Sequence, residues 1–304
     1  MTETPARVLW VVTDEKPGHR SQQEGLVERL QTLAPFDVHW LNIQNLQLSL
    51  MDVLLRRPVR PELPAPDWIL GAGAGTHALI LKLKYRFGAK TILLMRGAFP
   101  MALFDANITP LHDNPPQRAN VLPTIGVMNP VVPRYFGRND TTGTFLIGGS
   151  NEHYHWDDGE IIGQVVQVCQ GQPHVQWVLT DSRRTPDSFL PALKALGLAN
   201  LELISHRDTP RGFIKQQLDR TGQLWVTRDS VSMVYECLTS GAPTGLLAMT
   251  RLRQSRVVKD MDKLLGEGWL QDFNGWDLRQ PLPITEKRLW EADRGARWLL
   301  EYLG

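Results

Sequence analysis

The chain has 304 residues, which is enough for two domains of ordinary size. Hydrophobic residues make up 42% of the sequence and charged residues 21%, as is typical of a globular protein, and no apolar run approaches the ~20 residues needed to span a bilayer. The formal net charge is +1, so the overall charge does not favour nucleic acid as a partner.

The two cysteines, Cys169 and Cys237, lie inside apolar stretches, and no spacing of cysteine and histidine is typical of a metal site or a redox pair. We therefore expect buried thiols, no bound metal and a reducing compartment. The apolar run Val8–Val12 is too short for a signal peptide and is followed directly by the polar segment 13–15. These features predict a cytoplasmic protein.

Short apolar runs alternate with longer amphipathic ones, which is typical of βα units built on a parallel sheet. In the first half of the chain, helical spacing of apolar residues predicts a first helix with Ser21 as its N-cap. The predicted elements there are strands at Arg7–Val12, Asp37–Leu41, Trp68–Leu70, Lys90–Met95 and Asn107–Pro110, and helices at Ser21–Leu33 and Thr76–Phe87.

The proline-rich segment Asp113–Pro133 is predicted to cross between domains without regular structure. A second βα series follows, and it ends in an amphipathic helix at Leu289–Leu303. Its elements are strands at Thr144–Ile147, Val175–Leu179, Leu201–Ile204, Gln223–Thr227 and Thr244–Ala248, and helices at Asp157–Val168, Ser188–Leu196, Phe213–Leu218 and Ser230–Ser240. We therefore predict α/β domains at residues 1–135 and 136–285, followed by a terminal helical segment at 286–304.

A strand-to-helix turn in the second domain, Asp229–Glu236, is the strongest candidate ligand site. The free N–H groups and positive dipole end of a helix N-terminus suit a diphosphate. Ser232 and Glu236 are four residues apart, so they share a helix face, and the carboxylate could accept hydrogen bonds from ribose hydroxyls. The alternative is that Ser230 merely caps the helix and that Glu236 is a solvated surface residue.

Two more loops of this domain follow strands directly. Gly148 and Gly149 precede Ser150 and Asn151, and the glycines would let a ligand approach the backbone closely. Ser182 precedes Arg183 and Arg184, which could clamp a phosphate. A tight turn and a solvated charge pair are the alternatives. Because all three loops follow strands of one domain, together they predict one wall of a nucleotide pocket.

In the first domain, the loop after the first strand holds Asp14, Lys16, Gly18 and His19 at the head of a helix. An imidazole there could act as a general base near neutral pH. Neither nucleotide-binding glycine fingerprint is present in this loop, and Gly71–Gly75 is predicted to be a packing turn.

Histidines also occur in two further segments. His112 and Asp113 follow another strand and could line a cleft as a polar wall. His153 and His155 lack the spacing and the third ligand of a metal site.

Six motifs spread over nearly the whole chain resemble the mitochondrial-fission family named for the plant protein ELM1. They are Asp14–Gln22, Phe104–Asp113, Asn120–Gly126, Ile147–Asn151, Asp181–Pro186 and Thr227–Met233. That family is similar in organisation to GT-B glycosyltransferases. The resemblance implies two Rossmann-like domains facing a cleft, with a C-terminal helix that crosses back to the first domain and a donor bound mainly by the second.

The similarity extends to the glycosyltransferase that adds N-acetylglucosamine to the peptidoglycan lipid precursor. It implies that residues of the second domain hold the nucleotide diphosphate and that residues of the first face the acceptor. The donor residues implied are Ser150, Asn151, Arg183, Ser230, Ser232 and Glu236; the acceptor-facing ones are Asp14, Lys16 and His19. Here the first loop contains Asp-Glu-Lys-Pro-Gly-His in place of a run of glycines, which leaves the acceptor class open.

These observations predict a metal-independent, GT-B-type glycosyltransferase that moves a sugar from a nucleotide-sugar to an envelope glycan or a lipopolysaccharide-core-like acceptor, without a cofactor. We expect it at the cytoplasmic face of the inner membrane, in peripheral contact, with no nucleic-acid partner. The expected site comprises His19 and Asp14 as catalytic residues; Gly148, Gly149, Ser150, Asn151, Ser182, Arg183, Arg184, Asp229, Ser230, Ser232 and Glu236 for the donor; and Lys16, Gly18 and His112 for the acceptor. The alternatives are a nucleotide-sugar epimerase of the same fold and a non-catalytic binding or recruitment protein.

Overall fold

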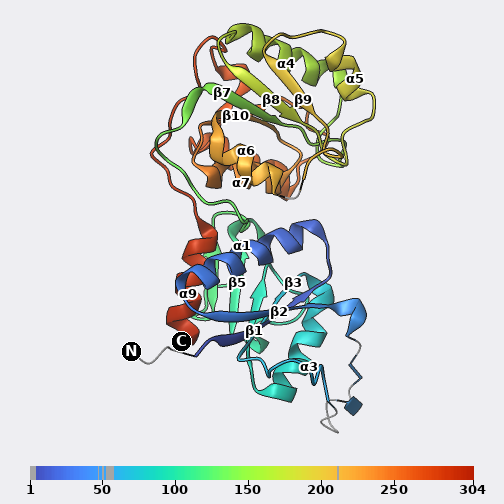
Figure 1. Cartoon of the computed structure of the whole chain (residues 1–304), viewed down its shortest axis with the longest axis vertical. Coiled ribbons are helices and arrows are strands. Elements are labelled where there is room, and N and C mark those ends of the chain that lie inside the picture. Colours follow the sequence, from blue (N-terminus) through green and yellow to red (C-terminus); the bar gives the residue numbers. More distant parts are fainter. Residues whose placement is uncertain (1–4, 47, 50, 53–57, 211) are drawn as a thin grey trace. The chain divides into compact units, whose positions relative to one another are not determined.

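The structure is a computed structural model, and it describes residues 5–46, 48–49, 51–52, 58–210 and 212–304. The chain divides into two compact units (Figure 1). Unit 1 comprises Met1–Pro130 and Trp290–Gly304, and unit 2 comprises Val131–Leu289. Each unit contains one six-stranded sheet in which every described strand pair is parallel. The predicted α/β class with two Rossmann-like units is confirmed.

The sheet of unit 1 has the strand order β2-β1-β3-β4-β5-β6. Its strands are β1 (Arg7–Thr13), β2 (Phe36–Asn42), β3 (Trp68–Ala72), β4 (Lys90–Leu94), β5 (Ala106–Pro110) and β6 (Val121–Thr124). Its helices are α1 (Pro17–Leu33), α3 (His77–Phe87) and α9 (Glu291–Leu303), with short 3-10 turns η1 (Ile43–Asn45), η2 (Ala74–Thr76), η3 (Met101–Leu103) and η4 (Leu111–Asp113).

Alternating side chains of the strands of unit 1 enter two separate cores. Leu9 and Val11 of β1 pack in the core that α1 and α9 cover, whereas Trp10 and Val12 pack in the core that α3 covers. This follows from the period of two along a strand, since successive side chains point to opposite faces of the sheet. A strand covered on both faces needs an uninterrupted apolar run, as β1 has.

The sheet of unit 2 has the strand order β12-β11-β10-β7-β8-β9. Its strands are β7 (Asn139–Leu146), β8 (Gln176–Thr180), β9 (Leu201–Ile204), β10 (Thr221–Thr227), β11 (Thr244–Leu247) and β12 (Gln271–Asp272). Its helices are α4 (Asp158–Gly171), α5 (Phe189–Lys194), α6 (Phe213–Arg220), α7 (Val231–Ser240) and α8 (Arg256–Gly266), with a 3-10 turn η5 (Phe273–Gly275). Helices α4 and α5 cover one face of the sheet, and α6 and α7 cover the other (Figure 1).

Helix α9 belongs to unit 1, although it follows unit 2 in the sequence. Its buried residues Ala296 and Leu299 share a core with Leu26 and Leu30 of α1. An ion pair between α1 and α9 joins Arg29 Nη2 to Asp293 Oδ1 at 2.6 Å. The last helix therefore completes the core of the first unit.

Several predicted boundaries are wrong. Helix α1 begins at Pro17 rather than at Ser21, because proline suits the first helical position and Lys16 occupies the N-cap. The segment 113–133 contains strand β6, which pairs in parallel with β5 despite Pro123. Pro123 is tolerated because β6 is the edge strand of the sheet. Helix α8 and the two-residue strand β12 were not predicted.

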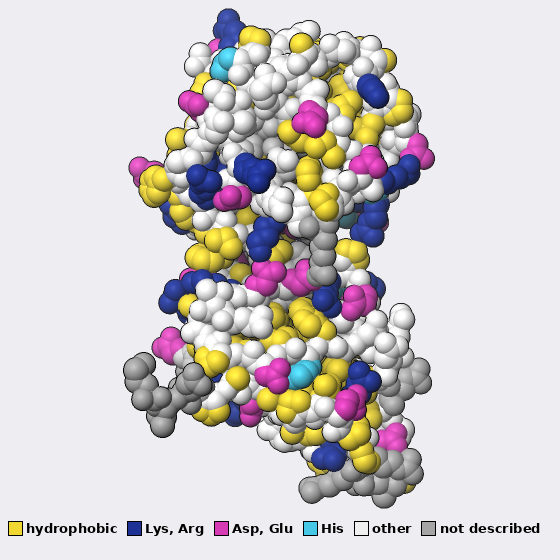
Figure 2. Space-filling model, in the orientation of Figure 1, with side chains coloured by type: hydrophobic (Ala, Val, Ile, Leu, Met, Phe, Trp, Pro, Cys, Tyr) yellow, Lys and Arg dark blue, Asp and Glu magenta, His cyan; other side chains and the backbone are white. Residues whose placement is uncertain are grey.

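The distribution of surface charge fits the net charge of +1, and the two cysteines are buried as their apolar surroundings in the sequence predict. On the face seen in Figure 2, charges of both signs are interspersed over each unit. Cys169 and Cys237 are free and buried, as predicted, and burial raises the pKa of the Cys169 thiol to about 12. Within the described ranges, no helix has both the length and the apolar character needed to cross a membrane.

Candidate functional site

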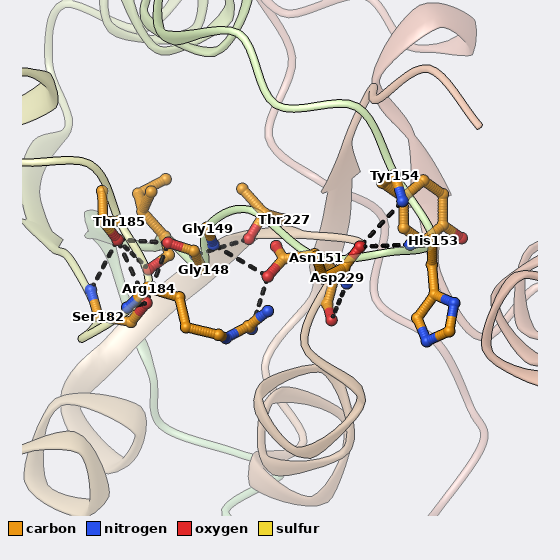
Figure 3. Close-up of polar contacts among 11 residues, drawn as sticks. Gly148, Gly149, Asn151, His153, Tyr154, Ser182, Arg184, Thr185, Thr227 and Asp229 are labelled. Carbon is orange, nitrogen blue, oxygen red and sulfur yellow. Dashed lines mark hydrogen bonds and ion pairs between the residues drawn. The ribbon is translucent and has the colours of Figure 1, made fainter. Parts of the chain in front are cut away.

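Three loops at the carboxyl edge of the unit 2 sheet are joined by one buried carboxylate. They follow the adjacent strands β10, β7 and β8. The Asp229 side chain is fully buried; its Oδ2 accepts a hydrogen bond from Gly149 N at 2.9 Å and pairs with Arg184 Nη2 at 2.6 Å (Figure 3). Asp229 thus holds the loop after β7 and the loop after β8 against the start of α7.

The protein itself fills the space beside the two glycines. A Cβ atom on Gly148 would lie 2.2 Å from Asp229 Oδ2, and one on Gly149 would lie 2.0 Å from the carbonyl oxygen of Arg184. The sequence suggested that these glycines admit a ligand, but the structure shows that close packing between loops already requires them. No larger residue fits at either position without moving backbone or the buried carboxylate.

Further side-chain hydrogen bonds fix the same loops (Figure 3). Ser182 Oγ donates to Gly148 O at 3.0 Å, and Thr185 Oγ1 also donates to Gly148 O. Asn151 Nδ2 donates to Asp229 O at 3.0 Å, while its Oδ1 accepts from the backbone N–H of Tyr154 at 2.9 Å. Ser182 and Asn151, both predicted donor residues, therefore bridge backbone groups of neighbouring loops.

The N-terminus of helix α7 lacks a side-chain cap. Ser230 is the N-cap residue, but its hydroxyl makes no cap hydrogen bond, whereas Ser255 caps α8 by accepting from Val258 N. Ser230 therefore occupies the N-cap position without the side-chain hydrogen bond that the alternative interpretation, a simple cap, would require. The Ser230 side chain thus leaves the first N–H groups of α7 uncapped, and these groups, together with the helix dipole, favour an anion. Ser232 lies in this first turn.

A cavity of about 320 Å³ lies at the same edge, on the face that α6 and α7 cover. Glu236 and Met233 of α7 line it three residues apart, and Arg183 lines it from the loop after β8. Its remaining lining residues are Leu146, Thr180, Asp181, Ser182, His206, Thr209 and Ile214. Thr180 Oγ1 is buried and has no hydrogen-bond partner within the described chain. Such a group in a cavity wall is suited to a polar ligand.

The two neighbouring arginines differ in their surroundings. Arg184 forms an ion pair with Asp229. Arg183 is exposed and lines the cavity, and it makes no ion pair with any described residue. From the sequence, both arginines were predicted to bind one phosphate. In the structure, Arg183 rather than Arg184 is available to a ligand in this cavity.

The sequence did not single out His206 as a site residue. Asp181 Oδ1 accepts hydrogen bonds from His206 N at 2.5 Å and from His206 Nδ1 at 3.0 Å, so the carboxylate orients the imidazole beside the cavity. His206 comes two residues after β9 ends. The same rule that selected the other loops, polar residues just past a parallel strand, could have identified it.

In unit 1, a histidine and an aspartate form a close pair after β1. His19 Nδ1 lies 2.9 Å from Asp14 Oδ1 and 3.0 Å from Oδ2, and the Asp14 side chain is only 7% exposed. Burial by itself would raise the pKa of Asp14, but hydrogen bonds from His19 and from the Lys16 backbone outweigh it and lower that pKa. The ionised carboxylate favours the ring tautomer with its proton on Nδ1, which leaves Nε2 as the basic atom.

The turn after β3 packs directly against this imidazole. Gly73 has a φ of 81°, and a Cβ atom there would lie 2.2 Å from His19 Cε1. The Gly71–Gly75 segment was predicted to be a packing turn, and here it fixes the position of the His19 ring. The edge also holds strained backbone, because Glu15, Met95 and Asn114 all have positive φ.

The predicted acceptor residues lie at one edge of unit 1 but not in one cluster. Lys16 Nζ is 3.6 Å from Asp14 Oδ2, and Gly18 is exposed in the first turn of α1. His112 lies in η4 after β5, three strands from β1, or about 14 Å at the usual strand spacing. Within the part of the chain that the structure describes, no three His, Cys, Asp or Glu side chains gather as a metal site.

Comparisons with known proteins agree with this architecture. The model of the family described as "Mitochondrial fission ELM1" matches residues 17–303. The protein RP120 of Rickettsia prowazekii is 23% identical over 290 residues, covering 77% of this chain and 81% of that protein.

Among solved structures, UDP-GlcNAc 2-epimerase from Methanocaldococcus jannaschii matches with a TM-score of 0.56 at 11% identity, covering 98% of this chain and 100% of that one. The S. aureus protein MnaA, solved with UDP, matches with a TM-score of 0.51 at 14% identity, covering 98% of this chain and 97% of that one. At these identities the match establishes the two-unit fold.

Proposed function

Because the chain belongs to the mitochondrial fission ELM1 family and has the fold of UDP-GlcNAc 2-epimerases, we propose that it is a metal-independent glycosyltransferase that uses a nucleotide-sugar. Its acceptor would be an envelope glycan or a lipopolysaccharide-core-like glycolipid. The observation that carries the proposal is the cavity at the carboxyl edge of unit 2, which Arg183 lines together with Met233 and Glu236 of helix α7. The N-terminus of that helix has no side-chain cap. A relative by fold, MnaA, was solved with UDP.

Each part of a nucleoside diphosphate has a matching group in unit 2. The N–H groups at the start of α7 and the Arg183 guanidinium suit the diphosphate. The Glu236 carboxylate suits ribose hydroxyls, and the cavity between Met233, Ile214 and His206 suits the base. In this proposal Asp229 and Asn151 position the loops rather than touch the donor.

In the proposed reaction, unit 1 supplies the base. Nε2 of His19 takes the proton of an acceptor hydroxyl while Asp14 stabilises the imidazolium that forms. The acceptor oxygen bonds to the anomeric carbon, and the bond from that carbon to the diphosphate oxygen breaks. The electron pair leaves with the diphosphate, whose added charge is stabilised by the helix end and Arg183.

The nucleotide part of the proposal predicts a thermal shift. UDP, or whichever of GDP, ADP, dTDP and CMP binds, should stabilise the protein by about 2.7 kcal/mol when present at 100 times its Kd. Glu236→Ala should raise that Kd roughly 10- to 100-fold, because a hydrogen bond to a charged group contributes about 1.5–3 kcal/mol. Glu202→Ala, an exposed carboxylate of unit 2 outside the cavity, is the matched control. Failure of all five nucleotides to shift unfolding would refute nucleotide binding.

An epimerase is the second candidate, because relatives by fold are UDP-GlcNAc 2-epimerases. Incubation with the nucleotide-sugar alone separates the two activities: an epimerase forms an isomeric nucleotide-sugar without acceptor, whereas a transferase needs an acceptor to release nucleotide. A binding or recruitment protein would do neither, and its biological activity would survive removal of His19 and Glu236.

We also propose that unit 1 contacts a membrane surface, which would bring it to a glycolipid acceptor. Phe99 is 40% exposed in the segment after β4, and Leu111 is 44% exposed after the neighbouring strand β5. Arg96 Nη1 donates to Asp113 O at 3.1 Å, which joins the two segments and adds a cation to this edge of unit 1. Such a surface suits an anionic bilayer.

This contact is testable with vesicles of phosphatidylglycerol and phosphatidylethanolamine. Changing both Phe99 and Leu111 to aspartate should lower co-sedimentation about tenfold or more, because one apolar side chain contributes about 1.5–3 kcal/mol when it is fully buried. Leu196→Asp, which alters a 52% exposed leucine in unit 2, should have no effect. Equal binding by all variants would rule out this surface.

A further inference from the structure

Unit 2 contains a second cavity, of about 520 Å³, at the carboxyl edge of the same sheet. Because helix α4 forms part of the cavity wall, the cavity lies on the face of the sheet opposite to α6 and α7 (Figure 1). The other walls are the residue after β10, the segment after β11 and the start of η5. The lining residues are Glu160, Gln164, Arg228, Ala248, Met249, Thr250, Arg251, Asp272, Phe273 and Asn274.

Both arginines of this cavity are already neutralised by the protein. Arg228, which is buried, donates from Nη2 to Asp272 Oδ2 at 2.8 Å and from Nε to Leu247 O at 3.0 Å. Arg251 Nη2 pairs with Asp262 Oδ1 at 2.5 Å. A phosphate would have to compete with these carboxylates for each guanidinium, so the cavity does not suit an anion.

Three other polar side chains are left available. Glu160, Thr250 and Asn274 are exposed, and their side chains make no hydrogen bond or ion pair within the described ranges. They offer a carboxylate, a hydroxyl and an amide, so the wall presents both donors and acceptors. Gln164 differs, because its Oε1 and Nε2 are occupied by the backbone of Ala248 at 2.6 and 2.9 Å.

We propose that this cavity binds a neutral saccharide. A sugar ring carries several hydroxyls, each able to donate and accept, and these match the three available side chains. Its C–H face suits the apolar part of the wall, where Met249 and Phe273 line the cavity. A neutral ligand also agrees with the internal pairing of both arginines.

The saccharide site is separate from the proposed nucleotide site. Arg228 and Asp229 are consecutive, yet Arg228 lines this cavity while Asp229 holds the loops after β7 and β8. None of the residues that line one cavity lines the other. Unit 2 can therefore hold a sugar and a nucleotide at once, and the saccharide site does not depend on the proposed transferase activity.

The test uses the full chain and saturation-transfer NMR with N-acetylglucosamine, glucose, galactose and mannose as probes. At least one sugar should bind, with the same Kd when UDP is saturating. Asn274→Ala and Glu160→Gln should each raise that Kd at least fivefold, while Glu236→Ala should leave it unchanged. Circular dichroism would confirm that the variants fold, which is expected because both altered side chains are exposed.

Three results would overturn the proposal: binding of none of the four sugars, displacement of the sugar by UDP, or displacement by inorganic phosphate. Loss of UDP binding in Glu236→Ala with sugar binding retained would support both sites. Sugar binding without any nucleotide binding would support this cavity and refute the proposed function.

Discussion

Replacing His19 by alanine is expected to lower the turnover number roughly 10²- to 10⁴-fold, the usual contribution of a positioned general base. The ring is held on one side by Asp14, 2.9 Å from its Nδ1, and on the other by the backbone of Gly73. Because His19 belongs to unit 1 and the proposed nucleotide site to unit 2, the Kd of the nucleotide should not change. The measurement is nucleotide release from the donor found by thermal shift, with a glycolipid fraction as acceptor.

Two variants sharpen this experiment. Asp14→Asn keeps the size of the side chain but lets the imidazole take the other tautomer, so turnover should again fall by orders of magnitude. His39→Ala is the matched control, because His39 lies in the middle of β2, away from the carboxyl-edge loops. Full turnover in His19→Ala would exclude this residue as the base.

Gly149→Ala is expected to lower the free energy of unfolding by about 1–3 kcal/mol, the usual cost of forcing extra atoms into a packed site. The added Cβ would lie 2.0 Å from the carbonyl oxygen of Arg184, which is backbone and cannot rotate away. Moving that loop would also disturb the pair between Arg184 and Asp229, so nucleotide affinity should fall at least tenfold. Urea unfolding and titration with the bound nucleotide would measure the two effects.

Gly163→Ala provides the control in the same unit. Gly163 lies inside helix α4, and a Cβ atom there would have no heavy atom within 4 Å. Because alanine favours a helix over glycine by about 1 kcal/mol, this variant should be more stable than the wild type and bind nucleotide normally. If Gly149→Ala behaved in the same way, the close packing of the three loops would not matter for the site.

Much of the fold follows from local pattern. The alternation of apolar and amphipathic runs predicts the parallel sheets, because both faces of a covered strand must be apolar. Strand β6 was not predicted because it is short, contains Pro123 and, as the edge strand of the described sheet, pairs with β5 alone. The predicted first helix was one turn too short. The first turn of α1, from Pro17, exposes polar residues and lacks the apolar spacing found in the remainder of the helix.

The positions of the loops, directly after predicted strands, identified the candidate site, but they did not show which loop residues contact one another. That Arg184 pairs with Asp229, 45 residues away, depends on β7 lying between β8 and β10, and strand order is a tertiary property. The same order brings the loop after β9, with His206, to the cavity wall. The role of the two glycines could not be derived either, because it depends on which backbone lies beside them.

The return of α9 to unit 1 affects how the protein is made. During synthesis, Leu26 and Leu30 of α1 are complete long before Ala296 and Leu299, which cover them in the finished core. The face of α1 that contacts α9 therefore remains uncovered until all of unit 2 has been synthesised. Unit 2 is continuous in sequence and can fold in that interval, so the second unit to be synthesised is the first that can be finished.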